Sequence, residues 1–174
     1  MPFLMMSASG LVLLAAFWDM FSRRIPNLLP VIIAGLYLVH AASLAQWGQI
    51  PWHLLCGAAV LVVGIIIFSF GLLGGGDVKL LAALALWAGP EYLSLLLLMT
   101  CFAGGLLAFV FVVTMILCKN PTISQGLDWL FVYVFKRPAP MLQTRKAKEL
   151  QLPYGVAIAA AGFVVFYQFF RVLA

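Results

Sequence analysis

Apolar residues run along this chain in long blocks, which short polar or glycine-rich stretches separate. Six apolar blocks can be delimited, at residues 3–18, 28–46, 54–73, 78–90, 92–117 and 153–173. A membrane-spanning helix needs about 20 apolar residues, with a range of about 17–25, so the first and fourth blocks are short. The strict alternation of a membrane β-barrel is absent from the sequence. The pattern therefore predicts an all-α integral membrane protein, a polytopic bundle of six transmembrane helices.

The composition agrees with this fold class. The chain has 174 residues, of which 66% are hydrophobic and 9% are charged, whereas soluble domains have about 25% charged residues. We expect a single membrane domain over residues 1–174, with the lipid bilayer as its surroundings. The net charge of +5 does not indicate a nucleic-acid partner, because the basic residues cluster at the ends of the apolar blocks. Topology and anionic lipid headgroups account for basic residues in those places.

The basic residues also predict an orientation, because lysine and arginine accumulate in cytoplasmic loops. If the loop with Arg23 and Arg24 is cytoplasmic, six helices place nine of the ten basic residues on that side and leave Arg171 opposite. Both termini then lie on the non-cytoplasmic side. The same orientation places Asp19, after the first block, and Asp77, before the fourth, at the cytoplasmic face.

The longest polar region, residues 118–152, becomes a basic cytoplasmic loop in this arrangement. Within it, residues 127–135 are rich in aromatic side chains and precede Lys136 and Arg137. This composition predicts a short interfacial helix, and a re-entrant segment is the alternative.

Asp19 and Asp77 are the candidate chemical groups. The chain has only five acidic residues, and a carboxylate beside hydrocarbon is costly enough to indicate function. Asp77 follows three glycines, Gly74, Gly75 and Gly76, whose backbone lets an extended peptide approach closely. A structural alternative is that Asp77 caps the fourth helix, and that Asp19 is an interfacial anchor near Arg23.

Two carboxyl groups held close together tend to share one proton. The ionised member can take a proton from water while the protonated member donates to a peptide carbonyl. This acid–base chemistry needs no cofactor, and we expect no metal site. Cys56, Cys101 and Cys118 form no Cys-x-x-Cys pair, and His40 and His53 fall near the opposite face.

Three blocks of sequence resemble the type IV prepilin peptidase family of GxGD membrane aspartyl proteases. They occur in the family's order across most of the chain. The blocks are Asp19 followed by Arg24-Ile25-Pro26-Asn27, then Gly74-Gly75-Gly76-Asp77-Val78-Lys79-Leu80, and last Leu152-Pro153-Tyr154-Gly155-Val156-Ala157.

This resemblance implies that Asp19 and Asp77 are the catalytic pair and that Gly74, Gly75 and Gly76 form the active-site loop. It implies a prepilin substrate, cut on the cytoplasmic side of its hydrophobic helix, in the bacterial inner membrane. Residues in supporting positions would be Lys79, Arg24, Pro26, Asn27, Pro153 and Gly155.

The chain departs from the longer, bifunctional members of the family. Those members carry a cytoplasmic domain between the first two helices, often with Cys-x-x-Cys motifs, and also N-methylate the new N-terminus. Here about ten residues separate the first two blocks, so methyl transfer is not expected. The short form resembles the peptidases of tight-adherence (Flp-type) pilus systems. The alternatives from other classes are a proton-coupled transporter and a non-catalytic pilus or secretion assembly subunit.

Overall fold

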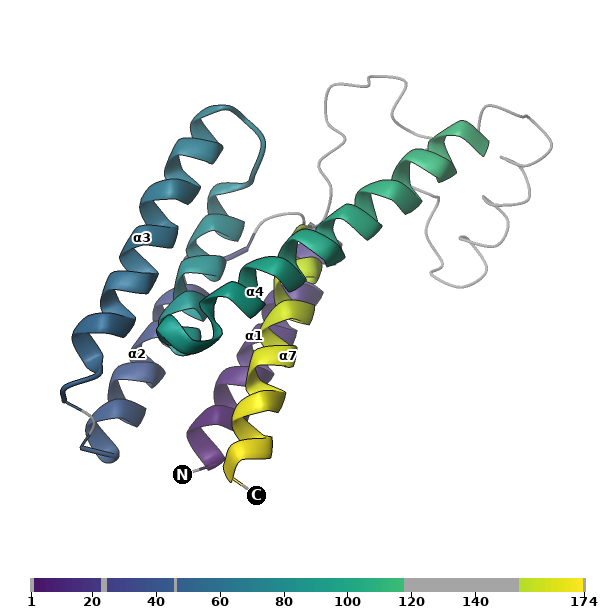
Figure 1. Cartoon of the computed structure of the whole chain (residues 1–174). Coiled ribbons are helices and arrows are strands. Elements are labelled where there is room, and N and C mark those ends of the chain that lie inside the picture. Colours follow the sequence, from purple (N-terminus) through teal and green to yellow (C-terminus); the bar gives the residue numbers. More distant parts are fainter. Residues whose placement is uncertain (1, 23–24, 46, 118–153, 174) are drawn as a thin grey trace. The chain divides into compact units, whose positions relative to one another are not determined.

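The computed structural model describes residues 2–22, 25–45, 47–117 and 154–173. Over these residues the chain is helical and has no strand, which confirms the all-α prediction for them. The helices are α1 (Pro2–Ser22), α2 (Leu28–Ser43), α3 (Ile50–Ser69), α4 (Gly75–Leu117) and α7 (Tyr154–Leu173) (Figure 1). The loop predicted at 118–152, with its interfacial helix, lies outside the described residues.

Four of the described helices contain segments long and apolar enough to cross a membrane. These segments are Phe3–Ser22, Ile50–Ser69, Gly75–Val113 and Tyr154–Arg171. Helix α2 is also apolar but has only 16 residues. The protein is therefore a multi-pass membrane protein.

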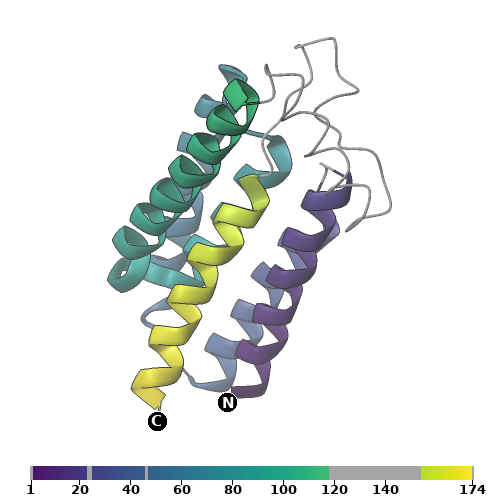
Figure 2. The same ribbon diagram turned by 90° about the vertical axis from the view of Figure 1, so that its right-hand side faces the viewer.

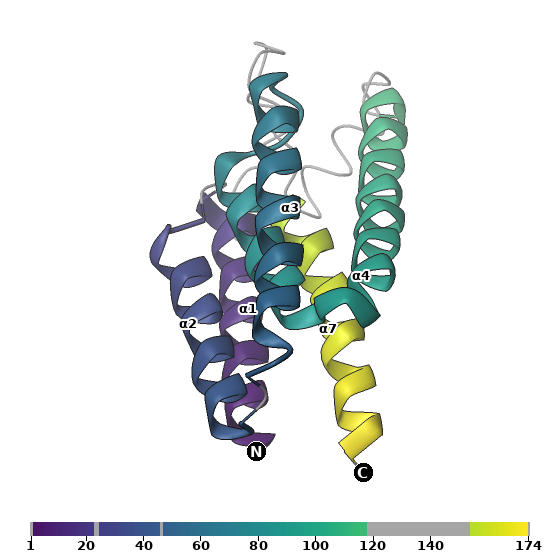
Figure 3. The ribbon, with the colours of Figure 1, turned by 60° about the vertical axis from the view of Figure 1, so that its left-hand side comes forward.

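Helix α4 is broken in its interior. Gly89 has φ 59° and ψ −171°, which is not helical, and Pro90 follows it. Only glycine adopts such backbone angles without strain, and proline cannot continue the hydrogen-bond ladder. The ribbon of α4 changes direction within the helix (Figure 3). The break separates residues 75–88 from 90–117, close to the predicted boundary between the fourth and fifth blocks.

Two helix boundaries differ from those predicted. Helix α3 lies about four residues earlier than the block 54–73, because Pro51 stands in its first turn and Gly71, with φ 72°, follows its end. Helix α4 begins at Gly75, before the predicted residue 78, and Val78 N–H donates to Gly74 O at 3.1 Å. All three glycines were expected to stay outside this helix, but Gly75 and Gly76 occupy its first turn.

The contacts divide the chain into two units, residues 1–104 with 153–174, and residues 105–152. In the first unit, α1 packs against α2 and α7, and Figure 2 shows α7 running beside α1. The start of α1 and the end of α7 lie at the same end of this unit in all three views. Of the second unit, the structure describes only the end of α4, residues 105–117.

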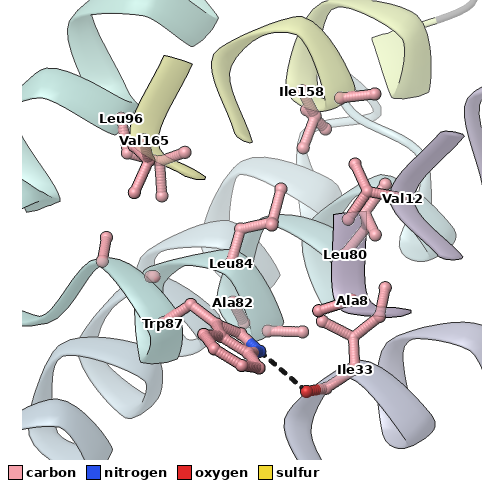
Figure 4. Packing of buried hydrophobic residues seen from close by; sticks show 14 of the residues in the cluster. Ala8, Val12, Ile33, Leu80, Ala82, Leu84, Trp87, Leu96, Ile158 and Val165 are labelled. Carbon is pink, nitrogen blue, oxygen red and sulfur yellow. Dashed lines mark hydrogen bonds between the residues drawn. The ribbon is translucent and has the colours of Figure 1, made fainter. Parts of the chain in front are cut away.

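The first half of α4 forms the centre of the first unit. Leu80, Leu84 and Trp87 are almost completely buried. Trp87 Nε1–H donates a hydrogen bond to Ile33 O of α2 at 2.9 Å (Figure 4). Other members of this core come from α1, α2 and α7 and include Ala8, Val12, Ile33, Ile158 and Val165.

Small residues let neighbouring helices approach this central segment closely. A Cβ atom added at Gly64 of α3 would lie 2.5 Å from Val78 Cγ1, and one added at Gly162 of α7 would lie 2.9 Å from Leu84 Cδ1. Without a hydrophobic driving force in lipid, such close packing is a main source of helix association. Residues 75–88 are therefore held tightly between α3 and α7, which fixes the start of α4.

Candidate active site

Asp19 and Asp77 are the buried charged residues in the described part of the chain, with 5% and 8% of their surface exposed. Asp19 lies in the last turns of α1, and Asp77 lies in the first turn of α4. Their carboxyl groups are close enough to interact electrostatically. The structure therefore brings together two side chains that are 58 positions apart in the sequence.

The start of α4 shapes the surroundings of Asp77. Gly74 precedes the helix, and its backbone N–H donates a hydrogen bond to the carboxylate of Asp77, which is the third helical residue. A Cβ atom at Gly74 would lie 2.7 Å from Asp77 Oδ2, so glycine leaves room for this contact. This is one half of a capping box, in which the third residue reaches back to the cap, since Gly74 has no side chain to complete the other half. The alternative in which Asp77 itself is the N-cap is therefore wrong.

The second oxygen of Asp77 has no such contact. Asp77 Oδ1 is buried and has no hydrogen-bond partner among the described residues. Buried polar atoms are nearly always paired, and exceptions often have a catalytic role. This oxygen is the position at which a hydrogen bond to a ligand is still available.

Asp19 is bound by the start of α7. Gly155 is the second residue of that helix, and its N–H donates to Asp19 Oδ2 at 2.9 Å. Amides in the first turn of a helix have no partner inside the helix and carry partial positive charge, so they favour an anion. A Cβ atom at position 155 would lie 2.7 Å from Asp19 Oδ2 and 2.9 Å from its Cβ and Cγ atoms. Glycine is therefore the residue that fits here.

The glycine loop is covered on one side by the chain itself. A Cβ atom at Gly76 would lie 3.0 Å from Ile25 Cβ and 3.4 Å from the backbone N and O of Ile25. The segment after α1 therefore packs directly on Gly76. Gly74 is exposed and Gly75 is partly exposed, so this part of the loop remains accessible beside Asp77.

Two of the predicted supporting residues contact each other. Lys79 Nζ donates a hydrogen bond to Asn27 Oδ1 at 2.9 Å. Asn27 stands at the N-cap position of α2 but makes no side-chain capping bond, so its amide oxygen is used for this contact between helices. Pro26 O accepts a hydrogen bond from Leu29 N–H at 3.1 Å at the start of α2. Arg24 and Pro153 lie outside the described residues.

The remaining candidate groups lie elsewhere. His53 stacks on Tyr37 and His40 stacks on Trp87, with ring centroids 5.1 and 5.3 Å apart. Among the residues that the structure describes, no group of three metal-ligating side chains occurs. Cys56 is buried and Cys101 is exposed, and both are free.

The fold and the site define an apolar helical bundle with a buried pair of interacting carboxyl groups. The model of the type IV leader peptidase family matches residues 6–109, more than half of the chain. The chain belongs to this family, as its sequence motifs indicated. The matched segment contains Asp19 and Asp77, while Gly155 lies beyond it. No curated protein and no solved structure shows a significant match.

Proposed function

We propose that this protein is an aspartic endopeptidase that removes the leader peptide from type IV prepilins of the Flp type. It acts at the cytoplasmic side of the bacterial inner membrane, and Asp19 and Asp77 are its catalytic pair. The observation that carries the proposal is the burial of these two carboxyl groups within electrostatic reach of each other. Membership of the type IV leader peptidase family supports it.

The arrangement in the membrane that we propose has six spans. The apolar part of α4 has 39 residues, which correspond to about 58 Å of straight helix, nearly twice the thickness of a hydrocarbon core. The break at Gly89 divides this length into two spans. The distribution of basic residues then favours a cytoplasmic position for the ends of α1 and α4 that carry the aspartates.

The proposed reaction needs only the two carboxyl groups and water. Asp19, ionised, takes a proton from the water molecule, whose oxygen attacks the carbonyl carbon of the scissile peptide bond. Asp77, protonated, donates its proton to the carbonyl oxygen. The C–N bond of the resulting intermediate then breaks, and the leaving nitrogen takes the proton held by Asp19 while the hydroxyl proton returns to Asp77. We assign the base to Asp19 because the Gly155 N–H stabilises negative charge there, whereas Asp77 has a buried oxygen, Oδ1, without a hydrogen-bond partner among the described residues.

The accessible part of the glycine loop suggests where the substrate lies. Gly74 is exposed and adjoins the carboxylate of Asp77. An extended leader junction can pass there without meeting a side chain, while the hydrophobic helix of the prepilin remains in the bilayer. Methyl transfer is not part of the proposal.

Co-expression with an Flp-type prepilin, with the mass of the prepilin as the readout, tests the proposal. The wild type should shorten the prepilin at its N-terminus, and Asp19→Asn and Asp77→Asn should each abolish the shortening. The side-chain amide oxygen introduced by Asp77→Asn can still accept the Gly74 N–H, so helix α4 should form. Glu91→Gln is the matched control, because it neutralises an exposed carboxylate on the same helix, and it should cleave normally.

Several results would argue against the proposal. Full cleavage by either aspartate variant would exclude the pair as the catalyst, while an added methyl mass would show that the protein also methylates. A proton-coupled transporter would need further ionisable groups leading to the opposite face. In the described part of the chain, Asp19 and Asp77 are the buried charged residues, so we favour the peptidase.

A further inference from the structure

The break in α4 leaves a backbone carbonyl without its helical partner. In a continuous helix, Leu86 O would accept a hydrogen bond from the N–H of residue 90. Residue 90 is proline and has no N–H, and the backbone angles of Gly89 already end the helical geometry. A carbonyl that loses its helical partner in a packed part of the protein costs free energy unless another group donates a hydrogen bond to it.

His53 of α3 satisfies this carbonyl. Its Nδ1 atom lies 2.9 Å from Leu86 O. A carbonyl oxygen can only accept a hydrogen bond, so Nδ1 must carry the proton. The contact therefore requires either the imidazole form that is protonated at Nδ1 or the imidazolium.

The surroundings of His53 hold the ring in this position. It stacks on Tyr37 of α2, with centroids 5.1 Å apart and planes 19° apart. On another side it lies against Gly89, where an added Cβ would overlap three atoms of the imidazole ring. The glycine thus provides both the positive φ of the break and the space for the ring that bonds to Leu86 O.

We propose that His53 is a positioning residue, which supplies the hydrogen bond that Pro90 cannot supply and so fixes the end of the helical segment 75–88. Asp77 lies in the first turn of that segment and Leu86 in its last turn. Fixing one end of a rigid helix restricts the orientation of the other. The hydrogen bond itself does not depend on the proposed peptidase function.

Nuclear magnetic resonance of the protonation state is the direct test. The chain has two histidines, so the full-length protein labelled with ¹⁵N-histidine, in nanodiscs at neutral or higher pH, gives two sets of ring signals. The His53→Asn variant identifies the set that belongs to His53. We expect a protonated Nδ1 and an unprotonated Nε2 for His53. The opposite form, protonated at Nε2 alone, would overturn the proposal even if no variant of His53 folded.

Two substitutions separate the hydrogen bond from the packing. His53→Asn replaces the Nδ1 donor with a side-chain amide, whereas His53→Phe keeps an aromatic ring against Tyr37 but has no donor. We expect His53→Phe to lower the apparent Tm by roughly 5 °C, because it leaves a partly buried carbonyl without a donor, and His53→Asn to recover most of it. Trp52→Phe, at an exposed neighbouring position, is the control and should leave Tm unchanged.

Activity provides the readout for positioning. With a cleaved prepilin, His53→Phe should lower kcat more than it changes KM, and His53→Asn should restore kcat. Wild-type Tm and kcat in His53→Phe would refute the role of the donor. If the aspartate variants show that the protein is not a peptidase, the NMR and Tm results still decide whether His53 replaces the missing amide.

Discussion

Substitution of Gly155 by alanine should disturb the proposed site through Asp19. The new Cβ would stand 2.7 Å from Asp19 Oδ2 and 2.9 Å from Asp19 Cβ and Cγ, whereas ordinary contacts of this kind are 3.4–4 Å. Asp19 and the start of α7 must therefore separate by roughly half an ångström or more. The N–H of residue 155 is retained, so the charge of the site does not change.

The size of the effect follows from this displacement. A misplacement of about 1 Å in an active site can lower the rate about 100-fold, so we expect kcat to fall roughly 10-fold to 100-fold in Gly155→Ala. The value of KM should change less, because in the proposed arrangement the substrate also contacts the exposed loop near Gly74. The assay is the initial rate of prepilin cleavage by purified enzyme in nanodiscs, over a range of prepilin concentrations.

Gly10→Ala is the matched control. Gly10 belongs to α1, as does Asp19, and no atom lies within 4 Å of the Cβ that alanine would add. This variant should keep wild-type kcat and gain slightly in helix stability. A Gly155→Ala protein that folds and cleaves at the wild-type rate would show that the contact between α7 and Asp19 does not position the carboxylate for catalysis.

Two further predictions concern the packing around the site. Gly64→Ala should destabilise the protein by about 1–3 kcal/mol, because the side chain of α4 that the new methyl group meets must move. Gly35→Ala is the control, since its methyl group would lie in open space, and it should not destabilise the protein. Thermal unfolding in detergent compares the two variants, and equal Tm values would contradict the close packing at Gly64. Lys79→Met and Asn27→Ala should each weaken the protein slightly, and the two effects should be non-additive by about 0.5–1 kcal/mol. Strict additivity in that double-mutant cycle would show that the hydrogen bond between the two side chains contributes nothing.

The sequence was sufficient for the helical fold and for the choice of Asp19 and Asp77 as candidates. Hydropathy is a local property, so the helices could be predicted without contacts. Asp19 and Asp77 could be selected because they stand at the ends of apolar blocks, while the side of the membrane on which they lie stays a prediction. The break at Gly89 and Pro90 was also visible, as the boundary between two apolar blocks. The role of Asp19 and Asp77 as catalysts remains a prediction.

The contacts that complete the site could not be predicted in the same way. Gly155 was selected only because it belongs to a sequence motif. Its hydrogen bond to Asp19 joins residues 136 positions apart, and a contact over that separation cannot be predicted from the local sequence. The start of α4 was placed too late, because glycine is a poor helix former in helix interiors, whereas these glycines occupy the first turn. His53 was placed near the opposite face, which gave no indication that it bonds to Leu86 O.

The hydrogen bond between Gly155 and Asp19 also has a consequence for the order of assembly in the membrane. Helix α7 is synthesised after the other described helices, and it supplies the amide that binds Asp19. A growing chain that has inserted α1 to α4 already contains both aspartates but lacks this donor. In the proposed peptidase, the ability to cleave peptides therefore arises only when α7 docks beside α1. An incompletely inserted chain carries both acidic residues but lacks the arrangement in which they would act on neighbouring peptides.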